Sequence, residues 1–475
     1  MAGATIDGGA GATAAPQPLA GAGLAPRRRS SYRPRALDVL RADAARMRAL
    51  RDVWLALWSS RLLVAAGGVG TVLALGFGPI RGAFNPPGVT RGFGGLGDVL
   101  AAPVARWDSA WYLVIAHFGY HPQLGHITAA RTAFFPVYPL GIKALSWLGS
   151  PAIVAGVLIS LVAFAAGLYG IHRLTTLELG RGAASASGGD AARLAVLATA
   201  FAPMAFFFSA VYSESLYLAL SVGVFWSARQ GRWAMTGVLG ALAAGTRSAG
   251  LVLLVPALMI YLYGPREDRP SPPARAGRLL ARLRPRFRLR GDALWLLLIP
   301  AGAVAFSLGL AVAGGDGLAP LRAQGVWGRH LAGPYVAVWD GLRAAFEGAR
   351  QLLSFQRAHV YFPAATGSPT VAAAHNLAQL AFLLAAVPAL LWAWRRLPAA
   401  YVVYVIAALA LPLSEPVTGQ PLMSLPRFLL VLFPLSIATG GWLAEHPRAR
   451  RPLLVLSAAL MVVFVAQFST WHWVA

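Results

Sequence analysis

The chain has 475 residues, of which 57% are hydrophobic and only 12% are charged, and its mean hydropathy is +0.60. Soluble globular proteins carry about 25% charged residues, so this composition excludes an ordinary soluble fold and predicts an all-α polytopic membrane protein; the absence of cysteine excludes disulfides and thiolate ligands. The formal net charge is +24, but the arginines gather in short loops beside apolar segments, which favours the positive-inside rule over nucleic-acid binding.

Residues 1–56 form a predicted cytoplasmic tail. Residues 1–26 are rich in Ala, Gly and Pro, which is typical of a disordered segment, and they lack the charged-then-apolar order of a signal peptide. The basic cluster "PRRRSSYRPR" at 26–35 is predicted to hold the N-terminus in the cytoplasm. Lys143 is the only lysine, and this preference for arginine, with abundant Ala and Gly, indicates a GC-rich bacterial genome and hence a bacterial plasma membrane.

Residues 57–475 form the predicted transmembrane domain, a bundle of about eleven transmembrane helices with a helical first outer loop. The first outer loop is 79–149, in which 134–149 has two prolines and a lysine and is predicted to lie along the outer surface. A basic cytoplasmic loop follows at 264–292 and a long outer loop at 314–374. The predicted spans are 57–78, 151–171, 194–211, 213–228, two halves of 234–263, 293–313, 375–394, 399–413, 428–444 and 453–470.

The apolar stretch 234–263 is interrupted by "GTRSAG" at 245–250. A single helix would bury Arg247 near its middle and would place the next loop, with nine arginines and three acids, on the outside. Two short helices with Arg247 at their outer turn avoid both problems, because packed neighbours allow short half-spans. In this topology Asp108, Glu214, Arg247 and Arg427 all lie at the outer face.

The stretch "RWDSAWYLVIAHFGY" at 106–120 places one aspartate in an aromatic setting just outside a predicted span. A loop aspartate is usually a helix cap or a solvated charge, and rings alone would form an interfacial aromatic belt. Together they also fit a sugar-binding cleft, in which rings stack on sugar CH faces and Asp108 acts as general base toward a hydroxyl. A lone carboxylate favours glycosyl transfer over hydrolysis, which usually needs a pair. The candidate substrate-binding rings here are Trp107, Trp111, Tyr112 and Tyr120.

Three more charged residues lie at predicted outer ends of spans. Glu214 in "VYSESLYLAL" either complements the dipole of a helix capped by Ser213 or Ser215, or faces the same cavity as the aspartate. Arg247 and Arg427, the latter in "LPRFLL", either snorkel to lipid headgroups or bind a phosphate through their guanidinium groups.

Metal and nucleotide motifs are weak. His117, His121 and His126 fall within ten residues, but without cysteine their spacing matches no recognised structural zinc set. The Gly-rich "GFGGLG" at 92–97 is not followed by GK[ST] and is a flexible loop rather than a P-loop. No cofactor is certain, and a divalent cation (Mg²⁺ or Mn²⁺) shared by Asp108 and Glu214 stays open.

Five motifs together resemble the family of GPI mannosyltransferase II (phosphatidylinositol-glycan class V) and its bacterial relatives. They occur in the family's order within 57–444, and Tyr138 in the second is a further candidate substrate-binding residue. The motifs are "RWDSAWYLVIAHFGY" (106–120), "AFFPVYPL" (133–140), "YSESLY" (212–217), "TRSAG" (246–250) and "PRFLLVLFPL" (426–435).

The resemblance implies the glycosyltransferase-C fold, in which an acidic residue of the first outer loop acts as base, and Asp108 matches that acid. It implies an inverting mannosyltransferase that takes mannose or a similar hexose from a polyprenyl-phosphate carrier. The acceptor would be a glycan or glycolipid at the outer face. Glu214, Arg247 and Arg427 are candidate substrate-binding residues, and the charge and location of the two arginines, rather than a family signature, make them candidates for holding the lipid phosphate.

The expected partners are the polyprenyl-phosphate-linked donor, the acceptor and membrane lipid, with no nucleic acid. The main rival function is a transporter or flippase of a lipid-linked sugar, although transporters often show internal repeats with paired broken helices and the sequence shows one broken segment. A hydrolase or ligase acting on lipid-linked glycans is a second rival, and a structural scaffold is a third.

Overall fold

The computed structural model describes residues 36–78, 94–120, 130–180, 185–269, 285–313, 315–358, 360–361 and 368–474. The chain divides into two units, Met1–Arg46 and Met47–Ala475. The described part of the first unit is the beginning of helix α1 (Ala36–Leu75). The predicted disordered tail 1–26, the basic cluster 26–35, His121 and His126 lie outside the described residues.

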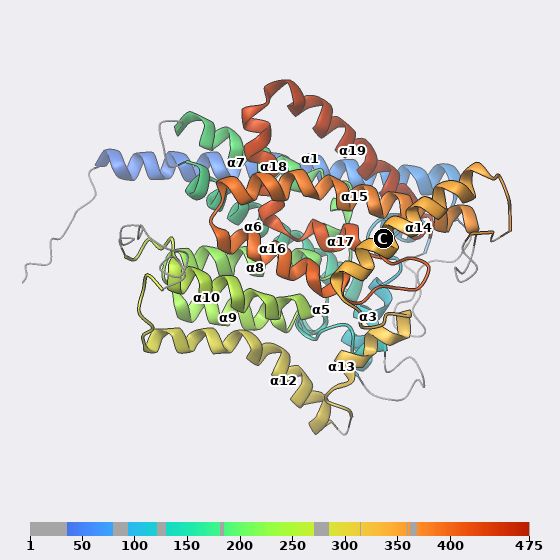
Figure 1. Cartoon of the computed structure of the whole chain (residues 1–475), viewed down its shortest axis with the longest axis horizontal. Helices are drawn as coiled ribbons and strands as arrows, with labels where there is room; N and C mark the ends of the chain where they lie inside the picture. Colours follow the sequence, from blue (N-terminus) through green and yellow to red (C-terminus); the bar gives the residue numbers. More distant parts are fainter. Residues whose placement is uncertain are drawn as a thin grey trace, which may run out of the picture. The chain divides into compact units, whose positions relative to one another are not determined.

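The regular secondary structure of the described residues is helical. Their only β pairing consists of the isolated bridges Arg329↔Val417 and Val417↔Gln420. Figure 1 shows these helices coloured along the chain, and they confirm the predicted all-α polytopic membrane protein. After α1 come α2 (Leu96–Ala101), α3 (Ser109–Phe118), α5 (Val137–Trp147), α6 (Ala152–Leu179), α7 (Ser185–Ala200), η1 (Ala205–Phe208), α8 (Glu214–Arg229), α9 (Trp233–Ala244), η2 (Ser248–Leu253), α10 (Leu254–Tyr263), η3 (Gly291–Leu297), α12 (Leu298–Val312), α13 (Ala319–Arg322), η4 (Ala323–Trp327), α14 (Pro334–Leu353), α15 (Pro369–Arg396), α16 (Ala399–Leu413), α17 (Leu425–Leu430), α18 (Phe433–Glu445) and α19 (Pro447–Ser469).

Each predicted span coincides at least in part with one or two of these helices, but the helices differ in length. Five are long and apolar enough to cross a membrane, namely Asp43–Leu75, Ala152–Leu179, Gly291–Val312, Pro369–Arg396 and Pro447–Ser469. The other predicted spans correspond to shorter helices: α7, α8, α9, η2 with α10, α16 and α18. The predicted count of eleven crossings stays a prediction for these shorter helices. The described part of the first outer loop contains α2, α3 and α5, so this loop is helical as expected.

The predicted span 194–211 is wrong in its second half. Helix α7 ends at Ala200, and an irregular segment with one 3₁₀ turn follows. Pro203 explains the break, because proline disfavours helix at the residue before it and lacks an amide donor. The buried guanidinium of Arg61 in α1 donates to the carbonyls of Ala200 (3.2 Å) and Ala205 (2.7 Å). The bond to Ala200 satisfies an acceptor that the lost helix would otherwise leave unpaired in an apolar setting.

The predicted span 428–444 is also interrupted. The short helix α17 ends at Leu430, and α18 starts at Phe433 with Pro434 in its first turn, a position that proline tolerates. The break separates Arg427 from the long helical segment and places it on a short helix of its own. This local geometry positions the arginine for the contacts described below.

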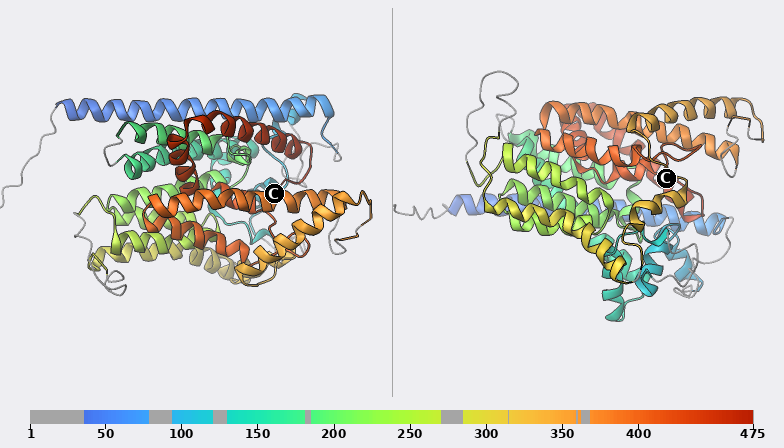
Figure 2. Two further views of the ribbon diagram at one scale, coloured as in Figure 1. Left: turned by 45° about the horizontal axis from the view of Figure 1, so that its top comes forward. Right: turned by 60° about the horizontal axis from the view of Figure 1, so that its bottom comes forward.

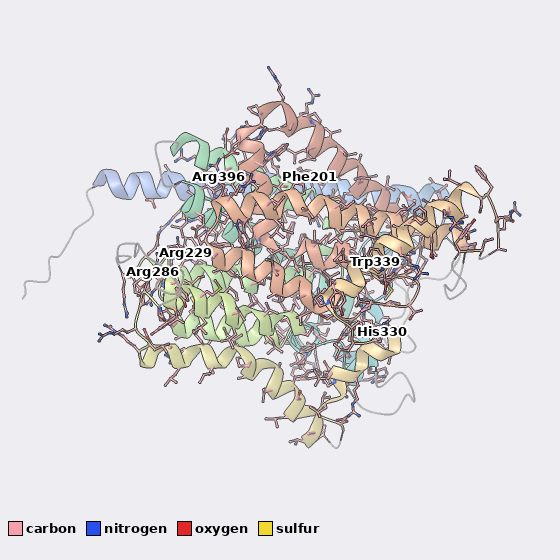
Figure 3. The ribbon with its side chains drawn as sticks, in the orientation of Figure 1. Phe201, Arg229, Arg286, His330, Trp339 and Arg396 are labelled. Atoms are coloured by element: carbon pink, nitrogen blue, oxygen red, sulfur yellow. The ribbon has the colours of Figure 1, made fainter. Side chains whose placement is uncertain are left out.

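Helix packing brings distant segments together. Helix α7 packs against α18, α6 lies between α7 and α8, and α9 packs against α8 and α12. Figure 2 shows that most of these helices run side by side in the second unit. Figure 3 shows Arg229, Arg286 and Arg396 toward one end of the helices and His330 and Trp339 toward the other. The first three belong to predicted cytoplasmic loops and the last two to a predicted outer loop, and the side of the membrane on which each lies stays a prediction.

Candidate functional site

Four charged residues from four separate segments form one chain of ion pairs. Nη1 of Arg427 lies 2.7 Å from Oδ2 of Asp108, and its Nε lies 3.1 Å from Oε1 of Glu214. Nη1 of Arg247 lies 2.9 Å from the same oxygen of Glu214. The order is therefore Asp108, Arg427, Glu214, Arg247, and we call this set the charge quartet. The structure thus brings together the four charged residues that the sequence placed at one face.

Asp108 is the most accessible carboxylate of the quartet. It immediately precedes α3, and its side chain is 18% exposed. It makes no side-chain cap hydrogen bond, so the helix-cap interpretation does not describe its carboxylate. Its backbone N–H donates to the Tyr212 hydroxyl, which in turn donates to the carbonyl of Arg106. The base of α3 is thus fixed to the segment that leads into α8.

The residue before Asp108 has an unusual backbone. Trp107 has φ 55°, a left-handed conformation that is costly for a bulky residue and typical of functional sites. Its ring packs edge-on against Trp471 and Trp473, with centroid distances of 5.7 and 5.2 Å. Its buried indole Nε1 and the buried hydroxyl of Ser109 have no hydrogen-bond partner among the described residues. Two polar groups therefore flank Asp108 with hydrogen-bonding capacity to spare.

Glu214 is the fully buried centre of the quartet. It is the first residue of α8 and is 0% exposed, and its Oε1 contacts both arginines while Oε2 has no hydrogen-bond partner among the described residues. Ser213 and Ser215 do not cap the helix, because their hydroxyls bond Tyr112 and the Phe208 carbonyl instead. A buried carboxylate of this kind needs paired cations. Glu214 therefore holds both guanidinium groups in place.

Arg247 lies at the break between α9 and η2, as the "GTRSAG" pattern predicts. The chain turns so tightly there that a Cβ added to Gly250 would lie 2.3 Å from the carbonyl carbon of Ala243, which only glycine permits. Arg247 is 14% exposed and pairs with Glu214, and its guanidinium lies 5.8 Å from the ring of Phe428. Its charge is engaged inside the protein rather than extended to lipid headgroups.

Arg427 carries the strongest set of contacts. Besides its two carboxylates, its guanidinium lies 5.3 and 5.1 Å from the rings of Phe207 and Tyr212. Burial alone would lower the pKa of this group, but the charges of Glu214 and Asp108 outweigh burial and hold the pKa above its usual value. Arg427 therefore stays charged at every physiological pH.

The predicted aromatic residues fall into two groups. Trp111 is partly exposed and stacks on Phe134 at 5.7 Å, while the Tyr120 hydroxyl donates to the Phe134 carbonyl. Tyr112 and Tyr138 are buried. The Tyr138 hydroxyl bonds the Gly156 carbonyl and Ser160 at 2.9 Å each. Trp107 and Trp111 are thus better placed to contact a substrate, and substrate contact by the two buried tyrosines stays a prediction.

Two residues of the loop 314–374 join the site although no motif marked them. Trp327 lies edge-on to Trp111 and Phe134, with centroid distances of 6.2 and 5.9 Å. Arg329 donates to the carbonyls of Glu415 (2.9 Å) and Met423 (3.1 Å). The only sequence signals were a tryptophan and an arginine close together in an outer loop, which are too common to be diagnostic.

Arg329 also shares a ring contact with the charge quartet and feels the charge of Arg427. Its guanidinium lies 5.9 Å from the ring of Phe428, which Arg247 also approaches. Burial lowers the pKa of Arg329, Glu415 raises it and the positive charge of Arg427 lowers it. No carboxylate of the described residues lies within 4.0 Å of it. Arg329 therefore adds a positive charge without a directly paired carboxylate among the described residues, and only the more distant Glu415 partly compensates it.

The described residues contain no group of three His, Asp or Glu side chains that could hold a metal ion. The guanidinium of Arg427 contacts both Asp108 and Glu214, so it takes the bridging position that a shared cation would need. A divalent cation at this site stays a prediction. His117 is exposed at the end of α3.

Comparison with known proteins places this geometry in context. Residues 94–262 match the family described as "Mannosyltransferase (PIG-V)", a segment that includes Asp108, Glu214 and Arg247. The rat protein "GPI alpha-1,6-mannosyltransferase 2" is 31% identical over 176 residues, which cover 36% of this chain and 34% of the rat protein. The mouse protein of the same name is 30% identical over 169 residues, covering 34% and 32%, and the Chinese hamster protein is 30% identical over 182 residues, covering 36% and 34%.

The matched region spans about a third of the length of these curated relatives. No solved structure matches the chain. The matched segment carries the first four of the five motifs, with Asp108 at the accessible end of the quartet and Glu214 at its centre. Over this segment, the chain is similar to the mannosyltransferase (PIG-V) family and to the curated proteins named GPI alpha-1,6-mannosyltransferase 2.

Proposed function

We propose that the chain is a bacterial membrane mannosyltransferase of the glycosyltransferase-C type. It transfers mannose, or a similar hexose, from a polyprenyl-phosphate-linked donor to a glycan or glycolipid acceptor on the outer face of the plasma membrane, with inversion at the anomeric carbon. The observation that carries this proposal is the position of Asp108, a partly exposed carboxylate held by Arg427 in a family-matched segment. The N-terminus would then lie in the cytoplasm.

Asp108 is the proposed general base. Its carboxylate accepts the proton of an acceptor hydroxyl while that oxygen attacks the anomeric carbon of the donor. The bond from this carbon to the phosphate oxygen breaks, and the polyprenyl phosphate leaves with the electron pair. Attack from the side opposite to the leaving group inverts the configuration. Trp107 and Trp111, on either side of the base, would stack on the sugars.

Arg427 contacts the carboxylates of both Asp108 and Glu214, so it keeps an anionic partner throughout the proposed reaction. The ion pair with Arg427 at 2.7 Å holds the Asp108 carboxylate in place before the reaction. When Asp108 takes the proton, Arg427 still has Glu214 as its partner at 3.1 Å. The guanidinium therefore does not become an unpaired buried charge during turnover, which would be costly.

Glu214 itself is unsuited to a role in hydrolysis. From the sequence, Asp108 is predicted to be a lone carboxylate. In the structure, Arg427 contacts both Asp108 and Glu214. Glu214 is 0% exposed and is held by two guanidinium groups, so it cannot activate a water on the substrate. Because Glu214 cannot act as a second catalytic carboxylate, glycosyl transfer is still favoured over hydrolysis.

The leaving phosphate needs positive charge that is not already neutralised. The quartet contains two carboxylates and two guanidinium groups, so its formal charge is zero. Arg329 adds a positive charge without a directly paired carboxylate among the described residues, beside Phe428, on whose ring Arg247 also lies. We therefore assign the phosphate to Arg329 together with Arg247, because guanidinium groups bind phosphate oxygens and stabilise developing charge.

A transporter or flippase of a lipid-linked sugar is the second candidate, and one observation favours it. The helical path is broken twice beside the quartet, between α9 and α10 and between α17 and α18. Broken helices at a central site are typical of secondary transporters. The two functions differ in whether a glycosidic bond forms.

A transfer assay distinguishes them. Purified protein in nanodiscs receives radiolabelled polyprenyl-phosphate-mannose with a membrane lipid and glycan extract, and donor binding is measured separately. Asp108→Asn is compared with Asp316→Asn, which changes an exposed aspartate of the outer loop. Label in a new product from the wild type and Asp316→Asn only, with donor bound by all three, supports the proposal. Donor binding without product in every variant supports the transporter, which flipping in proteoliposomes then tests.

A further inference from the structure

Helix α14 (Pro334–Leu353) carries an exposed apolar stripe that no described residue covers. At about 100° per residue, its members fall within about 60° of one another on the helix surface. Three of them are aromatic, and a contiguous exposed patch of this kind usually marks an interaction surface. The stripe consists of Tyr335 (77% exposed), Trp339 (67%), Leu342 (42%), Phe346 (65%) and Leu353 (76%).

The other two faces of α14 have different characters. One face is buried and made of small residues such as Ala337, Gly341 and Ala344, and the helix packs there against α15 and α16. The flank beyond is charged, and on it the 71%-exposed Arg343 pairs with Glu347 at 3.2 Å. The helix therefore presents one side to the protein, one to water and one that is apolar but uncovered.

We propose that α14 lies in the outer membrane–water interface with its apolar stripe against lipid. An amphipathic helix with a separate charged flank places its aromatic and aliphatic side chains among the lipid headgroups and the adjoining acyl chains. Trp and Tyr are the residues that favour this depth. Figure 3 shows Trp339 on the other side of the helices from Arg229 and Arg396, toward the right of the view.

The neighbouring span makes the partner lipid rather than protein. Helix α15 is a candidate span whose most apolar window is only 11% buried inside the protein, so most of its surface faces the membrane. Helix α14 packs along α15 and crosses it obliquely in Figure 1. The stripe therefore lies on a helix that packs against a candidate span whose apolar surface is mostly uncovered by the described protein.

This placement has a consequence for the site. Helix α14 follows closely after Trp327 and Arg329, which reach Trp111 and Phe428. A helix fixed at the interface would hold these two side chains at the level of the membrane surface. The proposal concerns lipid contact alone and stands whether or not the chain transfers a sugar.

The absence of cysteine in the chain allows a direct test with single cysteines. Phe346→Cys and Trp339→Cys place a probe on the stripe, and Arg343→Cys is the matched control on the charged flank of the same helix. Each is labelled with an environment-sensitive NBD fluorophore in phosphatidylcholine and phosphatidylglycerol nanodiscs. Quenching is measured with aqueous iodide and with lipids that carry a nitroxide near the headgroup or near the chain end.

We expect nitroxide lipids to quench mainly the probes on the stripe, and iodide to quench mainly the probe on the charged flank. Probes at the stripe should be quenched several-fold more by the headgroup-level nitroxide lipid than the probe at Arg343→Cys, and several-fold less by iodide. Equal iodide quenching on both faces would overturn the proposal. Protection of the stripe from iodide and from lipid would also overturn it, because a second copy or another protein would then cover the face.

Tyr335→Cys and Leu353→Cys, at the two ends of the stripe, test how far the lipid contact extends. Because α14 packs obliquely along the candidate span α15, the nitroxide lipids should quench both probes, each at its own depth. Iodide quenching at both ends equal to that of Arg343→Cys would contradict the proposal.

Discussion

Replacing Arg427 by glutamine tests the charge quartet most severely. The substitution removes the cation that contacts Asp108 at 2.7 Å and Glu214 at 3.1 Å. Glu214 is 0% exposed and would retain only Arg247 as a partner. Breaking a buried ion pair by removing one partner costs about 3–5 kcal/mol, because a desolvated charge loses its compensation.

This loss of unfolding free energy corresponds to a measurable decrease in Tm. An unfolding entropy of about 2.1 cal/mol/K per residue gives about 1 kcal/mol/K for 475 residues, so Tm should fall by about 3–5 °C. Micelles leave many helices formed, which lowers the unfolding entropy, so the shift should be at least this large. The measurement is thermal unfolding in detergent followed by intrinsic fluorescence.

Two further variants make the result specific. Arg343→Gln removes an exposed arginine with a helical i,i+4 partner, a pair worth only about 0.3–0.5 kcal/mol, so its Tm should barely move. Arg427→Gln combined with Glu214→Gln removes both charges and should recover part of the loss. The reasoning is refuted if Arg427→Gln melts like Arg343→Gln, or if the double variant simply adds the two single losses.

Three other changes separate function from packing. Arg329→Gln should weaken binding of the polyprenyl-phosphate donor about 10- to 150-fold, because one charge-assisted contact is worth about 1.5–3 kcal/mol. Arg343→Gln should leave the donor Kd unchanged, and equal Kd values for the two variants would remove Arg329 from the phosphate site. Tyr138→Phe should lower the free energy of unfolding by about 0.5–1.5 kcal/mol for each lost hydrogen bond. Tm should therefore fall while the KM for the donor stays the same. A raised KM at unchanged Tm would instead identify Tyr138 as a substrate contact. Arg61→Met should lower Tm because the Ala200 carbonyl loses its donor, at about 1–3 kcal/mol. An unchanged Tm would show that this carbonyl finds another donor.

Sequence patterns predicted the class of fold and much of the site. Hydropathy and arginine placement led to an all-α membrane protein, and each predicted span coincides at least in part with one or two helices. The interruption at "GTRSAG" placed Arg247 at a turn, where the structure has it. These predictions succeed because they rest on local properties: apolar length, and the cost of a charge at membrane depth.

Other features depend on contacts between distant residues. The early end of α7 is stabilised by Arg61, which lies in another helix and donates to the carbonyl of Ala200. The sharing of Arg427 between Asp108 and Glu214 requires three segments to meet. Trp327 and Arg329 enter the site only through the packing of their loop. No local periodicity encodes such meetings, so a single sequence cannot reveal them.

The most direct test of the account is a single-turnover measurement with donor already bound, comparing wild type with Asp108→Asn. Single turnover separates the chemical step from binding and product release. If Asp108 is the general base, the variant should bind donor normally and form product about 10²–10⁴-fold more slowly. Product formation at the wild-type rate by Asp108→Asn would contradict the account.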